Sequence, residues 1–242
     1  MKPFINFKTF ITTLIYFSIS LHNLEAYDPI DRFTFNCGTE GNSSDGQRTW
    51  TGDTNSKLLS SSQINPTTVS VPTTTQKPSI NKIPYSTARL SHTIFNYYFP
   101  VTTGPKFLRL FFYPSTYTNS FNRNDASFTV ISNGFTLLKD FNASLNADVE
   151  GVDTLVKEYV INVGEDQRLD LNFIPSNGNS NNYAFINGIE VISMPNDLYY
   201  TPSEDNEFPL VGTTISQAYT IQTTVALQTG NIHVKQHTKD IS

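Results

Sequence analysis

The sequence predicts an all-β protein, folded as a two-sheet sandwich of jelly-roll type. Runs rich in Phe, Tyr, Val and Ile recur along the chain and are bounded by Gly, Pro, Asn and Ser, which is the pattern of strands and turns. No long segment with helical periodicity competes with them, and 13 prolines and 12 glycines lie mostly between the runs. Many short strands joined by such turns favour two packed antiparallel sheets.

Five apolar runs are expected to form strands. They are Phe107–Tyr113, Phe128–Ile131, Tyr159–Val163, Leu169–Ile174 and Tyr183–Met194. Apolar and polar residues alternate strictly in the fourth run, so this strand is expected to bury one face and wet the other. The first run is almost continuously apolar, which is typical of a central strand covered on both faces.

The first 26 residues have the composition of a secretory signal peptide. Lys2 and Lys8 precede an apolar stretch at 10–21, and the first acidic residue is Glu25. The apolar stretch is shorter than the ~20 residues that a membrane-spanning helix needs. We therefore expect a signal peptide at 1–26, a secreted, extracellular mature chain, and no membrane span in this chain.

The charge pattern argues against nucleic acid as a partner. The formal net charge is −5, charged residues make up 15% of the chain, and Lys and Arg form no run. A surface of uncharged polar residues suits an extracellular β protein. Two Asn-x-Ser triplets begin at Asn42 and Asn142, and both asparagines are predicted N-glycosylation sites.

No pattern in the sequence predicts a catalytic residue, a metal site or a cofactor. His92, His233 and His237 are scattered, and phosphate-binding glycine loops are absent. Cys37 is the only cysteine, so a disulfide within the chain is excluded. We expect Cys37 to be a small buried residue in a strand, with catalysis or intermolecular pairing as the alternatives.

Acidic residues beside glycines form two groups in the second half of the chain. These are Asp148, Glu150 and Asp153, and then Glu165 and Asp166. Paired carboxylates are the requirement of glycoside hydrolysis. Their turn contexts indicate instead ordinary solvated loop residues.

Aromatic residues in expected loops are the main candidates for recognition. Such rings stack on sugar faces or anchor peptides, while the alternative for each is simple packing against strand edges. They are Trp50, Tyr85, Tyr97, Tyr98, Tyr117 and Phe121.

A set of ordered motifs resembles the malectin-like ectodomains of the plant receptor kinases of the FERONIA and THESEUS type. The resemblance covers residues 27–195. Its motifs are Asn36-Cys37-Gly38, Asp45–Asp53, Pro84–Arg89, Tyr98–Val101, Phe107–Pro114 and Tyr183–Pro195.

The resemblance implies a malectin-like jelly-roll β-sandwich at 27–195. It also implies an inter-domain connector and a truncated start of a second malectin-like domain at 196–242, with Leu198–Tyr200 in the connector. The family's membrane helix and kinase domain are then missing from this chain. The partners it implies are secreted RALF-type peptides, GPI-anchored co-receptors and pectin-type wall glycans in the plant apoplast.

Animal malectin, the lectin that gives the family its name, binds a glucose disaccharide through aromatic loop residues and one acidic residue. The resemblance places the corresponding residues of this chain at Tyr85, Tyr113, Tyr117 and Asn182. An amide then stands where the lectin has its carboxylate.

The leading hypothesis is therefore a non-enzymatic ligand-recognition module of a receptor-like kinase type. A truncated, non-signalling receptor fragment or decoy is the first alternative. A secreted carbohydrate-active enzyme is a remote one, because a fold alone does not determine function. The ligand and the oligomeric state stay open.

Overall fold

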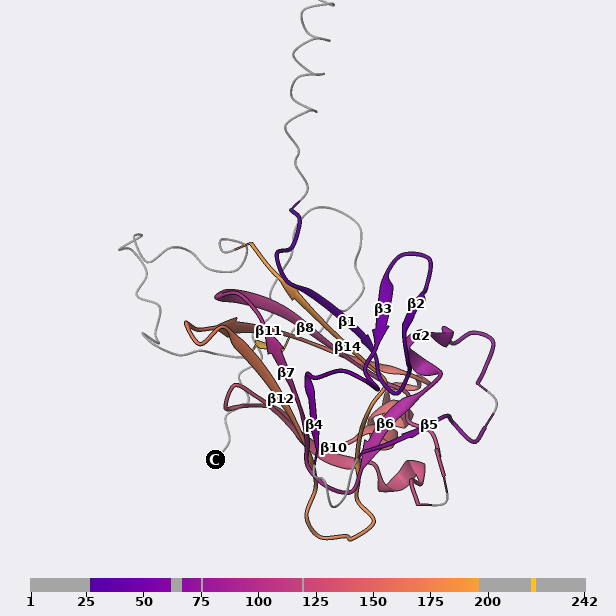
Figure 1. Ribbon diagram of the computed structural model, residues 1–242. Helices are drawn as coiled ribbons and strands as arrows, with labels where there is room; N and C mark the ends of the chain where they lie inside the picture. Colours follow the sequence, from indigo (N-terminus) through magenta and orange to yellow (C-terminus); the bar gives the residue numbers. More distant parts are fainter. Residues whose placement is uncertain (1–26, 62–66, 75, 119, 196–218, 221–242) are drawn as a thin grey trace, which may run out of the picture.

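The structure is a computed structural model that describes residues 27–61, 67–74, 76–118, 120–195 and 219–220. The predicted signal peptide, the predicted connector and His233 and His237 lie outside these residues. The chain forms two large β-sheets that face each other, with a smaller sheet at one end (Figure 1). The predicted all-β class is confirmed.

The larger sheet has seven strands. Their order is β15 (Tyr219–Thr220), β11 (Leu155–Val163), β8 (Gly104–Phe112), β14 (Gly188–Ser193), β1 (Arg32–Asn36), β3 (Thr49–Gly52) and β2 (Asn42–Ser44). All neighbours are antiparallel except β1 and β3, which run parallel. Figure 1 shows indigo β1 beside orange β14, so the beginning and the end of the sandwich meet in the middle of this sheet.

The second sheet has five strands and the third has three. The five-stranded order is β10 (Phe135–Asn142), β9 (Ser127–Ser132), β12 (Arg168–Pro175), β7 (Phe95–Pro100) and β4 (Leu59–Ser61). The three-stranded order is β13 (Ala184–Ile186), β6 (Ala88–Ser91) and β5 (Thr68–Ser70). The helical segments are α2 (Lys82–Tyr85), the 3-10 turn η1 (Arg123–Asp125) and α3 (Ala143–Glu150).

The main core lies between the two large sheets and is rich in phenylalanine. In β12, Leu169, Leu171 and Phe173 are fully buried while the residues between them are partly exposed, which confirms the predicted alternation. β8 lies between β11 and β14, as predicted for a central strand, but it is not covered fully on both faces, because Phe107 and Arg109 are partly exposed. Phe112 of β8 contacts the rings of Phe128, Phe141 and Phe185 at centroid distances of 5.5–5.7 Å.

A second, smaller apolar cluster lies outside the main core. Trp50, Tyr85, Phe111 and Tyr113 are all buried there and pack edge to face. The Trp50 indole N–H donates to Asp45 Oδ2 at 3.0 Å, which satisfies its one polar group. This cluster packs α2 against the outer side of the seven-stranded sheet, where Trp50 of β3 and Phe111 of β8 contribute to it.

Three expectations on local structure need correction. Trp50, Tyr97 and Tyr98 were expected in loops, but they lie in β3 and β7, and the side chains of Trp50 and Tyr97 are buried; Tyr85, also expected in a loop, ends α2. The run at 183–194 is not one strand, because the fully buried Asn187 separates β13 from β14. Asp148 and Glu150 lie in helix α3 and not in a turn. Cys37 is fully buried, as expected, although it lies just after β1.

Five buried tyrosines make the fold sensitive to alkali. Burial raises the pKa of each in the folded state; they are Tyr85, Tyr97, Tyr117, Tyr159 and Tyr183. Unfolded tyrosine ionises near pH 10, so above about pH 10 the unfolded state binds fewer protons and stability falls as pH rises. We expect part of the tyrosinate absorbance after an alkaline pH jump to appear slowly, together with loss of the β-sheet circular dichroism signal. Complete ionisation in one fast phase, with that signal unchanged, would contradict this.

Candidate ligand-binding cleft

A polar cleft lies where three loops meet at one end of the sandwich. It has a volume of about 260 Å³ and opens between the loop after β5, the loop after β8, and the region of α3 and the turn that follows it. Its lining includes Thr74, Tyr113, Thr116, Arg123, Asp148 and Asp153. Thr73 ties the first two loops together, because its main-chain N–H and its hydroxyl both donate to Thr116 O at 2.8 Å.

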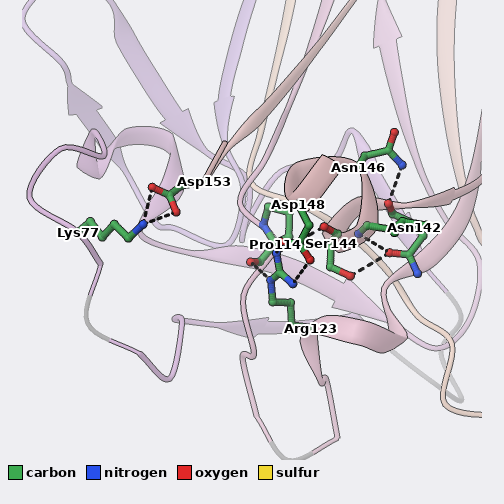
Figure 2. A network of polar contacts seen from close by, with 9 residues as sticks. Lys77, Pro114, Arg123, Asn142, Ser144, Asn146, Asp148 and Asp153 are labelled. Atoms are coloured by element: carbon green, nitrogen blue, oxygen red, sulfur yellow. Dashed lines mark hydrogen bonds and ion pairs between the residues drawn. The ribbon is translucent and has the colours of Figure 1, made fainter. Parts of the chain in front are cut away.

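Arg123 connects the loop after β8 to α3. Its guanidinium donates to Asp148 Oδ1 and Oδ2 at 2.6 and 3.0 Å and to the carbonyl of Pro114 at 3.1 Å, as Figure 2 shows. A two-pronged arginine–carboxylate pair of this kind fixes orientation as well as distance. The hydrogen bond from Arg123 holds the pKa of Asp148 below its usual value, so this link weakens only as pH falls below about 4.

A second ion pair closes the side of the cleft nearest the loop after β5. Lys77 Nζ lies 2.7 and 2.9 Å from the two carboxylate oxygens of Asp153, and both side chains are largely exposed. The charges of Arg123, Asp148 and Asp153 are therefore each balanced by a partner within the protein. A ligand of this cleft meets a polar surface with compensated charge, which suits hydroxyl and amide groups.

Helix α3 forms one wall of the cleft and has a capping residue at each end. At its start Asn142 Oδ1 accepts a hydrogen bond from the Leu145 N–H at 2.9 Å, which is an N-cap. At its end Gly151 adopts φ 67°, a left-handed conformation that glycine takes without steric strain, and its N–H bonds to helix carbonyls. The two caps fix where Asp148 stands.

The structure brings three of the four predicted binding residues together, mostly below the surface. Tyr85 and Tyr113 lie ring to ring at 6.4 Å, and Tyr113 lines the cleft. Tyr117 is only 2% exposed, and its hydroxyl donates to Tyr113 O at 2.7 Å. In this conformation Tyr117 therefore supports the backbone of Tyr113 and does not face the cleft.

Asn182 lies apart from these tyrosines. It stands in the loop after β12 beside a separate hollow of about 340 Å³, which His92 and Gly178 also line. Its side-chain amide donates to Ser176 O at 2.9 Å, and its main-chain carbonyl oxygen lies 3.1 Å from His92 Nδ1. The four predicted residues thus do not form one site in this structure.

Arg123 was not predicted as a member of this cleft. It sits in a polar loop, and its partner Asp148 is 25 positions away, so spacing carries no information on the pair. The acidic residues of this region are held by basic ones: Asp148 by Arg123, Glu150 by Lys157 and Asp153 by Lys77. In the described part of the chain, no group of three or more His, Cys, Asp and Glu side chains is placed to hold a metal ion.

The comparison with protein-family models matches a malectin-like domain over residues 35–225. The chain belongs to the malectin-like family. The match runs past residue 195, the end predicted for the domain, and within it Tyr219–Thr220 pairs with β11 of the larger sheet. Among curated proteins, the malectin-like chain is 42% identical over 204 residues to the receptor-like protein kinase FERONIA of Arabidopsis thaliana.

Solved structures of malectin-like ectodomains match most of this chain. The crystal structure of the plant receptor-like kinase FER has a TM-score of 0.65 and 40% identity, covering 71% of this chain and 44% of that one. The crystal structure of the peptide RALF23 in complex with FER and LLG2 has a TM-score of 0.67 and 37% identity, covering 80% and 47%. The extracellular domain of ANXUR2 from Arabidopsis thaliana has a TM-score of 0.63 and 36% identity.

The match with FERONIA includes 84% of the residues of this malectin-like chain but only 22% of the residues of FERONIA. The chain therefore spans about a fifth of the length of the curated receptor kinases that it matches. Among its described residues, no helix is long and apolar enough to cross a membrane.

Proposed function

We propose that this malectin-like chain is an extracellular ligand-recognition module of the receptor-like kinase type, and that it is not an enzyme. Its ligand would be a secreted RALF-type peptide, a GPI-anchored co-receptor or a pectin-type wall glycan. The observation that carries the proposal is its likeness to FER in a crystal structure that also contains the peptide RALF23 and LLG2. The predicted signal peptide at 1–26 fits this role and would place the mature chain in the apoplast.

The cleft between the three loops is the proposed place of recognition. Loops on a rigid β-scaffold commonly carry binding residues, because the scaffold fixes their ends while their sequences vary. Here Arg123 and the Asn142 cap hold the loops in one arrangement before any ligand arrives. Such preorganisation lowers the entropy cost of binding.

A binding experiment with two charge-matched variants tests this proposal. The secreted, glycosylated protein would be titrated against immobilised RALF-type peptide and against de-esterified pectin fragments over a range of salt. Arg123→Gln removes the link between two cleft loops. Arg168→Gln is the control, because it removes the same charge far from the cleft. Arg168 begins β12 and pairs with Pro100, a few residues before β8 starts, whereas the cleft is formed by the loop after β8 ends.

We expect saturable binding that Arg123→Gln weakens about tenfold or more, in line with the loss of charge-assisted hydrogen bonds, and that Arg168→Gln leaves nearly unchanged. Equal effects of the two variants would place recognition outside this cleft. Absence of saturable binding to both probes would overturn RALF-type peptide and pectin as the ligands.

A further inference from the structure

Helix α3 exposes two large apolar side chains. Leu145 is 59% exposed and Val149 is 79% exposed, although the helix buries the smaller Ala143 and Ala147. Residues four apart lie on one helical face, so Leu145 and Val149 form a continuous apolar stripe, here called the α3 stripe. Helical side chains lean toward the N-terminus, so this stripe leans toward the cap residue Asn142.

The amide of Asn142 uses only its oxygen within the described part of the chain. Oδ1 accepts from the Leu145 N–H and from Ser144 Oγ, each at 2.9 Å. Nδ2 has no hydrogen-bond partner among the described residues, and Figure 2 shows no contact drawn to it. Asn142 is partly exposed and heads the triplet Asn142-Ala143-Ser144.

We propose that Asn142 carries an N-linked glycan whose first sugar rings lie over the α3 stripe. In the glycosylation reaction, Nδ2 of Asn142 forms a bond to C1 of the first sugar and loses one proton. The bond between C1 and the diphosphate of the oligosaccharide donor breaks, and its electron pair leaves with the diphosphate. Oδ1 stays a carbonyl oxygen, so the N-cap survives. One side chain then caps the helix and anchors the glycan.

The chemistry of the stripe fits the first sugar rings. A pyranose ring has an apolar C–H face, and covering exposed leucine and valine with it removes apolar surface from water. The glycan would also lie beside the cleft, because Asp148 of the same helix lines it. This inference rests on the proposed secretion of the chain, because the donor is met in the secretory pathway.

Asn42 provides an internal comparison. It heads the other triplet and is exposed at the start of β2, the edge strand of the larger sheet. The structure thus places one predicted glycan on a strand edge and the other at a helix cap next to an apolar stripe. Only the second is expected to be held against the protein surface.

The test begins with site-specific glycan occupancy, measured by peptide mass mapping of the secreted protein. We expect both asparagines to be occupied. A glycan on Asn42 but none on Asn142 would overturn this inference while leaving secretion intact. A secreted protein with neither site occupied would overturn it too. Failure of the chain to reach the medium would instead contradict the proposed secretion, so the two failures are distinguishable.

Hydrogen exchange of the α3 amides then tests the contact. Asn142→Asp keeps an oxygen cap but removes the glycan, and we expect exchange about fourfold faster than in the glycosylated protein, the equivalent of one methylene group returned to water. Paired replacement of Leu145 and Val149 by glutamine should abolish this difference while occupancy stays high. Equal exchange with and without the glycan, at full occupancy, would overturn the contact.

Discussion

Asp53→Ala is expected to lower the free energy of unfolding by about 3–5 kcal/mol, the effect of leaving one member of a buried ion pair alone. Asp53 is completely buried, and its partner Arg89 is 4% exposed. Arg89 donates to both carboxylate oxygens, at 2.6 and 2.7 Å, and the Gly38 N–H donates to Oδ1 at 2.6 Å. The hydroxyl of Tyr97 also donates to this carboxylate.

The reason for the large effect is the guanidinium that Asp53 leaves behind. Burial alone would lower the pKa of Arg89, but its hydrogen bonds to Asp53 and its electrostatic interactions with Asp53 and neighbouring groups together outweigh that effect, so its pKa is raised overall. Without the carboxylate, Arg89 must stay charged in a nonpolar site or open the structure to water.

Chemical denaturation of purified variants measures this prediction. Asp53→Asn keeps the shape of the side chain and should fall between the wild type and Asp53→Ala. Asp153→Ala breaks the exposed pair with Lys77 and serves as the control, with an expected change below about 1 kcal/mol. A similar small change for Asp53→Ala would mean that the buried pair contributes far less than its burial suggests.

Asn187→Ala is expected to lower the free energy of unfolding by about 2–5 kcal/mol, because it leaves buried groups without partners that are worth roughly 1–3 kcal/mol each. Asn187 Oδ1 accepts from the Tyr113 N–H at 2.6 Å. Its Nδ2 donates to Thr87 O at 2.7 Å and to the Tyr117 hydroxyl at 3.0 Å. One amide thus joins the loop after β8, which lines the cleft, to Thr87 between α2 and β6.

Urea denaturation of Asn187→Ala, compared with Asn182→Ala, measures the effect. Asn182 is partly exposed and its amide makes one hydrogen bond to a backbone carbonyl, so its loss should change stability by less than about 1.5 kcal/mol. If the two variants proved equally stable, Asn187 would not be the link between these segments. Asn187→Asp keeps the acceptor for Tyr113 but loses both donors, so it should also be clearly destabilised.

Several long strands could be predicted from the sequence, because their alternation is set by the two faces of a sheet. Leu169, Leu171 and Phe173 show this in β12. β10 was missed although it has eight residues, because register shifts in its pairing with β9 interrupt its alternation. Strands of three residues, such as β2, β4 and β5, are too short to show any period. Helix α3 was missed for a different reason: Ala143 and Ala147 face inward while Leu145 and Val149 face water, which reverses the usual apolar pattern.

The candidate cleft was only partly predictable. Tyr113 and Tyr85 were predicted as binding residues through the family resemblance; their rings lie together, but only Tyr113 lines the cleft. Sequence alone does not show whether a tyrosine such as Tyr117 points outward or into the core, since both positions accept an amphipathic ring. The Arg123–Asp148 link depends on how two loops approach in space, which no local pattern records.

The central place of β1 has a consequence for how the molecule is made. Asn36 of β1 pairs with Gly188 of β14, about 150 positions later, and at about 5–20 residues per second the ribosome needs roughly 8–30 s to deliver that partner. During this interval one side of β1 offers unpaired backbone groups, which are a template for association with other chains. The most vulnerable moment of this sandwich therefore lies in its biosynthesis, and it is set by the order of strands along the chain and not by the stability of the finished fold.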